Sequence, residues 1–210
     1  MDKTVVRGLF RNKEKYADQE VAIKGWVRTN RAQKSFGFLN MNDGSFFENI
    51  QVVYSEESLK NFKDIQKYSV GSAVSVIGKL VLTGKASQPI EIQATSVELV
   101  GDCPENFPIQ PKRHTREFLR DVAHLRPRTN LFSAVFRVRS LVAHAIHCFF
   151  QERNFVYVHT PIITASDGEG AGEMFHVTTP GKDEFFGQPV NLTVTGQLQG
   201  EAFALAFHDI

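Results

Sequence analysis

Val21–Gly44 reads VAIKGWVRTNRAQKSFGFLNMNDG, and this segment carries the clearest fold signal in the first half of the chain. Apolar residues alternate along Val21–Thr29, and a second extended run, Phe36–Met41, leads into the tripeptide Asn42–Gly44. Alternation of this kind is typical of a strand with one buried face, and Asn-Asp-Gly is a turn signal. The stretch therefore predicts two successive β-strands, the second closed by a turn.

The segments after this stretch extend the same pattern. Ile50–Tyr54 (IQVVY) predicts a third strand, and Ser55–Tyr68 changes to helical spacing with Ser55 as a candidate N-cap. Ala73–Leu82 and Ile90–Val100 return to the strand pattern. Three strands, a helix and two strands is the order of an OB-fold, a five-stranded barrel that commonly binds oligonucleotides, although other small barrels share this order.

The second half of the chain has a different pattern. Prolines interrupt regular structure between Gly101 and His114, and Leu131–Gln151 then predicts an amphipathic helix whose wide apolar stripe indicates burial on more than one side. Phe155–Val158 predicts a short strand that ends at Thr160–Pro161. We therefore expect an α+β chain in three parts: a barrel at 1–102, a basic linker at 103–130 and the beginning of a second domain at 131–210.

Composition excludes several classes of protein. The 210 residues are 42% hydrophobic and 22% charged, which is typical of a soluble globular protein. Apolar runs are too short to span a membrane, and the charges of Asp2, Lys3 and Arg7 argue against a signal peptide. The two cysteines, Cys103 and Cys148, lie far apart, so we expect neither a disulfide nor a metal site, and a cytoplasmic location.

Charge is distributed unevenly along the chain, although the formal net charge is only +1. Bases predominate in Lys24–Lys34 and again in Lys112–Arg128, whereas the part from Thr160 onward carries seven acids and the single base Lys182. A basic front and an acidic back suggest a polyanion bound at one end and a cationic small molecule at the other. For any single charge, a solvated surface is the simpler interpretation.

Three segments of the second half resemble one enzyme family. Phe149–Phe175, FFQERNFVYVHTPIITASDGEGAGEMF, resembles the first signature motif of class II aminoacyl-tRNA synthetases, which consists of a long helix, a strand and a proline. Its end, EGAGEMF, resembles the asparaginyl-tRNA synthetases of the aspartyl, asparaginyl and lysyl subgroup. So do HLRPRTN at His124–Asn130 and LTVTGQLQGEAFAL at Leu192–Leu205. With the barrel pattern, the resemblance covers nearly the whole chain.

The resemblance implies a fold and an activity. The fold is an OB-fold anticodon-binding barrel followed by the first part of the antiparallel-sheet catalytic domain of a class II synthetase. The activity is ATP-dependent and Mg²⁺-dependent activation of L-asparagine and its transfer to tRNA(Asn), by a homodimer. In this family Pro161 would lie at the dimer interface; a proline that simply begins a loop is an equally good interpretation.

A tRNA-binding site follows from the residues and the resemblance together. An OB barrel stacks bases on aromatic side chains and follows phosphates with basic ones, for which Arg28, Arg31 and Lys34 are candidates. The resemblance implies that Phe38 stacks on the central anticodon base and that Gln51 reads this base, since an amide offers both donors and an acceptor. A strand phenylalanine is more often a core residue. The family usually has arginine where this chain has Asn42.

An amino-acid site is implied by the same resemblance. Glu169 would face the substrate ammonium group, for which a carboxylate is the natural partner, and Gln197 would bind the amino acid by hydrogen bonds. Aspartyl enzymes carry a lysine at the position of Gly200, and an unpaired buried ammonium would be costly beside a neutral amide. The glycine therefore favours asparagine over aspartate.

The later signature motifs, with their ATP-binding arginines, do not occur, and the last fifty residues contain no arginine. Phosphoryl chemistry needs concentrated positive charge. We therefore expect no catalytic residue in this chain, which would be a truncated part of the enzyme and inactive by itself. Two alternatives remain open: a fragment of an aspartyl or non-discriminating synthetase, or a non-catalytic OB-fold paralogue that only binds tRNA.

Overall fold

The computed structural model describes residues 4–85, 87–168, 170, 173–182, 184–185 and 187–210. The chain forms two compact units, Met1–Phe136 and Arg137–Ile210, and each is described by itself. The three-part division expected at residues 102 and 131 is finer than this one and stays a prediction. No helix in the described ranges has both the length and the apolar character that crossing a membrane requires.

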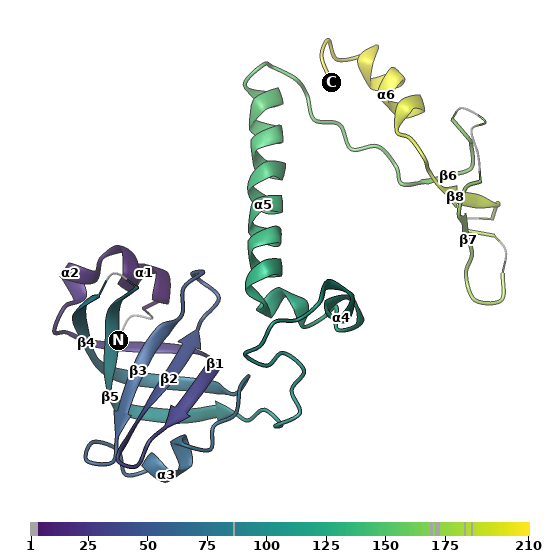
Figure 1. Ribbon diagram of the computed structural model, residues 1–210. Helices are drawn as coiled ribbons and strands as arrows, with labels where there is room; N and C mark the ends of the chain where they lie inside the picture. The colour runs from purple at the N-terminus through teal and green to yellow at the C-terminus, as the bar shows by residue number, and fades with distance from the viewer. Residues whose placement is uncertain (1–3, 86, 169, 171–172, 183, 186) are drawn as a thin grey trace. The chain divides into compact units, whose positions relative to one another are not determined.

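Unit 1 contains the predicted five-stranded barrel. The strands are β1 (Glu20–Ala32), β2 (Phe36–Asn42), β3 (Ile50–Ser55), β4 (Ala73–Lys85) and β5 (Gln88–Gly101). They close in the order β1-β2-β3-β5-β4, with β3 and β5 parallel and every other pair antiparallel (Figure 1). Each expected strand of the first hundred residues is present, and the OB-fold prediction is confirmed.

The helical segment expected at Ser55–Tyr68 is much shorter in the structure. Ser55 ends β3, a turn follows, and only α3 (Phe62–Ile65) is helical. The apolar spacing nevertheless has a structural meaning, because Leu59, Phe62 and Ile65 are all buried in the barrel core. The pattern marked the buried residues of this connection correctly but overestimated the length of its helix.

Two short helices that the sequence pattern did not predict precede the barrel: α1 (Val6–Arg11) and α2 (Lys13–Tyr16). The backbone N–H of Val6, at the start of α1, donates to the Asp43 carboxylate at 2.8 Å. Helix N-termini leave backbone donors unsatisfied, and a carboxylate there is favourable. The Asn-Asp-Gly turn therefore holds the N-terminal helix as well as ending β2.

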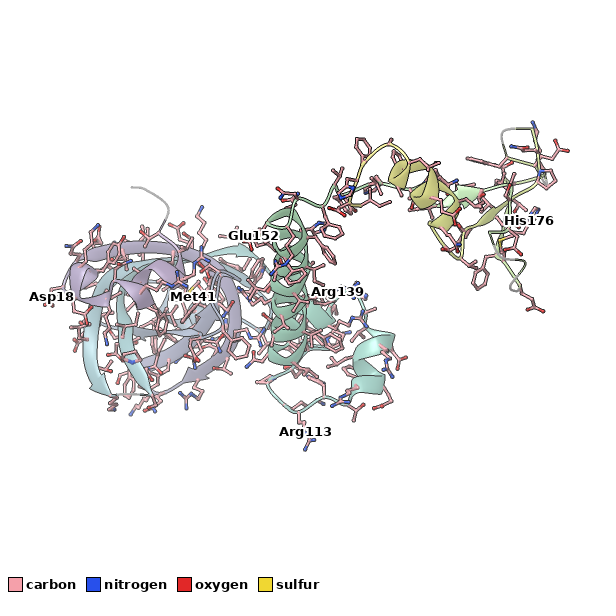
Figure 2. All side chains as sticks on the ribbon, turned by 90° about the horizontal axis from the view of Figure 1, so that it is seen from above. Asp18, Met41, Arg113, Arg139, Glu152 and His176 are labelled. Carbon is pink, nitrogen blue, oxygen red and sulfur yellow. The ribbon has the colours of Figure 1, made fainter. Side chains whose placement is uncertain are left out.

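The barrel interior is filled by the inward side chains of all five strands. Leu39, Met41 and Tyr54 are fully buried, and Met41 lies inside the barrel in Figure 2. The Tyr54 hydroxyl donates to the Asn30 side chain at 2.8 Å, which satisfies the polar end of this ring, and burial raises the pKa of Tyr54. Gly37 lies directly against the Tyr54 ring, and a Cβ at this position would overlap it.

The linker packs on the barrel within unit 1. It contains α4 (Arg116–Asp121), capped by the Thr115 hydroxyl, and a 3-10 turn at Arg126–Arg128. The Arg128 guanidinium lies over the rings of Trp26 and Phe107, 5.5 Å from each centroid. Such cation–π contacts stabilise by about 0.5–2 kcal/mol each.

Unit 2 holds most of α5 (Asn130–Gln151), the helix predicted from the apolar stripe, and α6 (Gln197–Ala204). Between them β6 (Ile163–Thr164), β7 (His176–Val177) and β8 (Val190–Leu192) form a small antiparallel sheet in the order β6-β8-β7 (Figure 1).

Two expectations about unit 2 are wrong. Residues 155–158 form no strand, because no described strand pairs with them and the sheet begins at β6. The long helix, expected to be buried on more than one side, has no buried residue. Amphipathic spacing shows that a helix has an apolar face that can be buried. Whether this face is buried depends on the other elements that pack against it.

Candidate nucleic-acid interface

A groove of about 440 Å³ lies on the outer face of the barrel. The strands alternate, so that Leu39 and Met41 fill the interior while Phe38 and its alternate neighbours face outward. Phe38 is therefore not a core residue. The residues that line the groove come from β1, β2, β3, β4, β5 and the β1–β2 turn: Arg31, Gln33, Phe38, Gln51, Thr83, Lys85, Gln88 and Glu91.

An aromatic side chain and a cation form one side of this groove. Arg31 of β1 and Phe38 of β2 are cross-strand partners, and the Arg31 guanidinium lies 5.8 Å from the centroid of the Phe38 ring. The Phe36 ring contacts Phe38 edge-on at 5.5 Å and supports it laterally. An aromatic platform beside a guanidinium suits a nucleotide, because the ring can stack on the base while the cation meets the phosphate.

Hydrogen-bonding side chains line the rest. Gln51 of β3 and Glu91 of β5 are partners in the parallel ladder, and the Gln51 amide nitrogen donates to Glu91 Oε2 at 3.2 Å. The amide nitrogen of Gln88 donates to the same oxygen at 3.3 Å. Gln51 is 8% exposed, so its amide is held in place and has little freedom to turn.

Sequence reasoning found three of the groove residues, Arg31, Phe38 and Gln51, and missed the other five. Two of these five, Lys85 and Gln88, had a weak sequence signal, because they flank a turn between two predicted strands. No local signal could have found Glu91, because it reaches the groove through the pairing of β5 with β3, forty residues apart in the chain.

Arg28 does not lie in this groove. It has no partner in the β1–β2 register, which shifts between Val27 and Thr29, as in a β-bulge. Its guanidinium donates to the main-chain carbonyl of Arg128 and lies 3.5 Å from the side-chain oxygen of Asn130. Burial and then the Arg128 cation lower the pKa of Arg28. The structure thus joins Arg28 to the linker, and its expected phosphate contact stays a prediction.

Two other residues singled out from the sequence lie near the groove strands. Lys34 is exposed in the turn between β1 and β2 and is not a lining residue. Asn42, at the position where the resembling family has arginine, donates to the carbonyls of Phe46 and Glu48 and accepts from the Gly44 N–H. Asn42 therefore shapes the loop after β2.

The residues expected around an amino acid lie in unit 2. Gln197 begins α6, is exposed, and donates through its amide to Glu201 at 2.9 Å. Glu169 lies outside the described residues. Its neighbour Gly168 packs against Thr195, and Gly196 packs against Thr160, which precedes the exposed Pro161. These contacts place Gly168 beside Thr195 and Thr160 beside Gly196, next to the start of α6.

This region does not fit ATP. From Thr160 onward Lys182 is the only base, it is exposed, and seven acids accompany it in the sequence. A triphosphate with its metal needs several positive charges close together. The charge of this region therefore does not complement that of a triphosphate.

Two models of known protein families match parts of this chain. That of the OB-fold nucleic acid binding domain covers residues 21–100, and that of class II tRNA synthetases (D, K and N) covers 115–209. The whole chain is 62% identical to an asparagine–tRNA ligase of Acholeplasma laidlawii and 59% identical to one of Alkaliphilus oremlandii. In both cases it covers 48% of the relative, so the chain spans about half the length of these curated relatives.

Solved structures agree in fold. The asparaginyl-tRNA synthetase from Pyrococcus horikoshii, complexed with asparaginyl-adenylate, matches with a TM-score of 0.84 and 24% identity over 98% of this chain and 45% of that one. The asparaginyl-tRNA synthetase of Entamoeba histolytica matches with a TM-score of 0.74 and 20% identity over 90% of this chain and 43% of that one. The chain therefore matches an OB-fold nucleic acid binding domain followed by a class II tRNA synthetase (D, K and N) domain, and it is similar along its whole length to asparagine–tRNA ligases.

Proposed function

We propose that the barrel binds the anticodon loop of tRNA(Asn) in the groove of Arg31, Phe38 and Gln51. The observation that carries this proposal is the convergence of a half-exposed aromatic ring, a guanidinium and an amide on one outer face of an OB barrel. The ring stacks on a base, the guanidinium meets a phosphate, and the amide offers donors and an acceptor to the base edge.

An anticodon hairpin tests this proposal. The 210-residue chain should bind an RNA hairpin with the asparagine anticodon, and Phe38→Ala should weaken binding by about 1–3 kcal/mol, the usual contribution of one base–aromatic stack. Phe47→Ala is the matched control, because Phe47 is an exposed phenylalanine outside the groove. Equal affinities of all three chains, with the fold intact by circular dichroism, would refute the site.

The same proposal extends to a parent protein, by which we mean a protein of the relatives' full length that contains this chain. The names of the relatives state that they are asparagine–tRNA ligases, and the longer enzyme would likewise ligate L-asparagine to tRNA(Asn), using ATP and Mg²⁺. It would act in the cytoplasm as a homodimer in which Pro161 lies at the interface. Glu169 would pair with the substrate ammonium group, and Gln197 would hydrogen-bond the amino acid. The exposed apolar surface of α5 supports the dimer.

ATP–pyrophosphate exchange tests the enzymatic part. The 210-residue chain should show no asparagine-dependent exchange, since its part from Thr160 onward carries seven acids and the single base Lys182. In a longer parent that exchanges, Glu169→Ala and Gln197→Ala should each raise the KM for asparagine far more than the KM for ATP. Equal effects on both would remove these residues from the amino-acid site.

The choice of asparagine over aspartate can be tested at Gly200. A Cβ built at Gly200 meets no described atom within 4 Å, so a side chain can begin at this position without a clash. In the longer parent, Gly200→Lys should weaken asparagine activation, because the added ammonium group finds no charged partner on a neutral amide. Unchanged kinetics for both amino acids would place Gly200 outside the specificity site.

A further inference from the structure

We propose that Arg28 and Arg128 form a second anion site, in which a free phosphate ion binds between the barrel and the linker. The site lies within unit 1 and shares no lining residue with the groove of Arg31 and Phe38. The two sites use different cavities and different cations, so that either can exist without the other.

Two hollows flank this pair of arginines. The larger, of about 180 Å³, is lined by Trp26 and Arg28 of β1, by the loop after β2, and by Arg128 with its neighbours in the linker. The smaller, of about 130 Å³, has the same three side chains in its wall and extends to Phe107. None of the described residues that line either hollow is acidic, whereas the groove on the outer face contains a glutamate.

The two cations act on each other without a counter-ion. The Arg28 guanidinium donates to the main-chain carbonyl of Arg128, and burial and then the Arg128 cation lower the pKa of Arg28. Neither arginine forms an ion pair with a carboxylate in the part of the chain that the structure describes. The Arg128 guanidinium contacts the rings of Trp26 and Phe107 and donates to no described acceptor. An anion that lies beside both guanidiniums would remove their repulsion.

The chemistry of the pair fits a phosphate group. A guanidinium presents a planar fork of N–H donors that matches two phosphate oxygens, and one phosphate has enough oxygens for two forks. Sites for larger ligands usually occupy about 300–1,000 Å³, so the hollow beside these arginines suits a phosphate group better than a whole nucleotide. A free or terminal phosphate carries about 1.5–2 negative charges at neutral pH and therefore complements two cations better than the singly charged phosphate of an RNA backbone.

A bound phosphate would fasten the linker to the barrel. Arg28 belongs to β1 and Arg128 to the linker, so an ion held by both side chains joins two segments that lie far apart in the sequence. A ligand that binds only the folded state stabilises this state as its concentration rises. Phosphate should therefore stabilise the barrel unit.

The experiment titrates the 210-residue chain with inorganic phosphate at constant ionic strength, with chloride as the balancing anion. The emission of Trp26, which lines both hollows, should change and reach saturation, and the urea midpoint should rise with phosphate. Arg128→Gln should weaken phosphate binding about tenfold or more, the effect of losing a charge-assisted contact. Arg113→Gln is the matched control, because it removes the same charge from an exposed position of the linker outside both hollows.

A second variant tests the barrel side of the site. Arg28→Lys keeps the charge but loses the planar fork, and it should weaken phosphate binding several-fold. If circular dichroism shows that Arg128→Gln does not fold, the Arg28→Lys titration decides. A wild-type chain that responds to phosphate no more than to chloride, or variants at both arginines that bind phosphate as tightly as the wild type, would overturn the site.

An RNA hairpin distinguishes the two sources of phosphate. Saturating inorganic phosphate at constant ionic strength should leave the affinity for the hairpin unchanged, because the free ion occupies its own site. A competitive loss of hairpin affinity in the wild type that disappears in Arg128→Gln would assign the arginine pair to the RNA backbone and overturn its assignment to the free ion.

Discussion

The two units of this chain differ in how much of their apolar surface they bury. In the barrel unit, twenty hydrophobic residues form one continuous buried cluster. Among the described residues of 137–210, Val190 alone is buried. The α5 side chains Val138, Leu141 and Ile146 remain 58%, 69% and 53% exposed.

The difference follows from the closure of the barrel. Five alternating strands that close into a barrel cover one another's apolar faces and leave no unpaired strand edge, so the barrel needs nothing further. An amphipathic helix and three very short strands have no such closure. In the relatives, about half of each protein has no counterpart in this chain. We therefore expect the barrel unit to be stable and unit 2 to associate.

The largest expected effect concerns the barrel core. Leu39→Ala removes a fully buried side chain and should lower the free energy of unfolding by about 2–5 kcal/mol, measured by urea denaturation. Val190→Ala, the corresponding change in unit 2, should barely alter this transition, because so little else is buried around it. Comparable losses from both substitutions would contradict the contrast between the units.

A single charge introduced into the apolar surface of α5 should weaken the self-association of the chain. Light scattering should find dimers or larger species of the 210-residue chain, and Leu141→Lys should weaken their association more than tenfold by introducing a charge into the apolar surface. Ser140→Lys adds the same charge at a neighbouring exposed polar position and should leave association nearly unchanged. A cooperative monomer in the wild-type chain would rule out this role for the helix.

The linker should prove to be part of the barrel unit. Arg128→Ala removes the contacts with Trp26 and Phe107 and should cost about 1 kcal/mol. Trp26 is the only tryptophan in the sequence, so its fluorescence emission reports directly on this contact. Arg113→Ala, on the exposed segment before α4 (Figure 2), serves as the control. If the emission of Trp26 is the same in all three proteins, the linker does not rest on this ring in solution.

The smallest expected effect is electrostatic. Arg31→Ala should weaken binding of every RNA hairpin to a similar extent and lower the slope of log affinity against log salt concentration by about one. Lys24→Ala, at an exposed position of the same strand outside the groove, should leave this slope unchanged. A loss confined to one anticodon would instead assign Arg31 to base recognition.

Local pattern determined the barrel and part of its groove. Strand alternation is a property of neighbouring residues, so all five barrel strands and α5 could be predicted from the sequence. Arg31 could be found as a basic residue on a predicted strand of an OB barrel. The resemblance to asparaginyl-tRNA synthetases added Phe38 and Gln51.

The other features of the groove and of unit 2 depend on contacts between segments that are distant in the sequence. The parallel pairing of β3 with β5 brings Glu91 to Gln51, and no property of either segment specifies that register. The register shift beside Arg28 joins this residue to the linker, although alternation counted from Val21 does not reveal the shift. The apolar stripe of α5 likewise predicts only that this face of the helix can be buried, not what packs against it. Contacts between distant segments depend on how the whole chain closes, and that information is absent from any short stretch of the sequence.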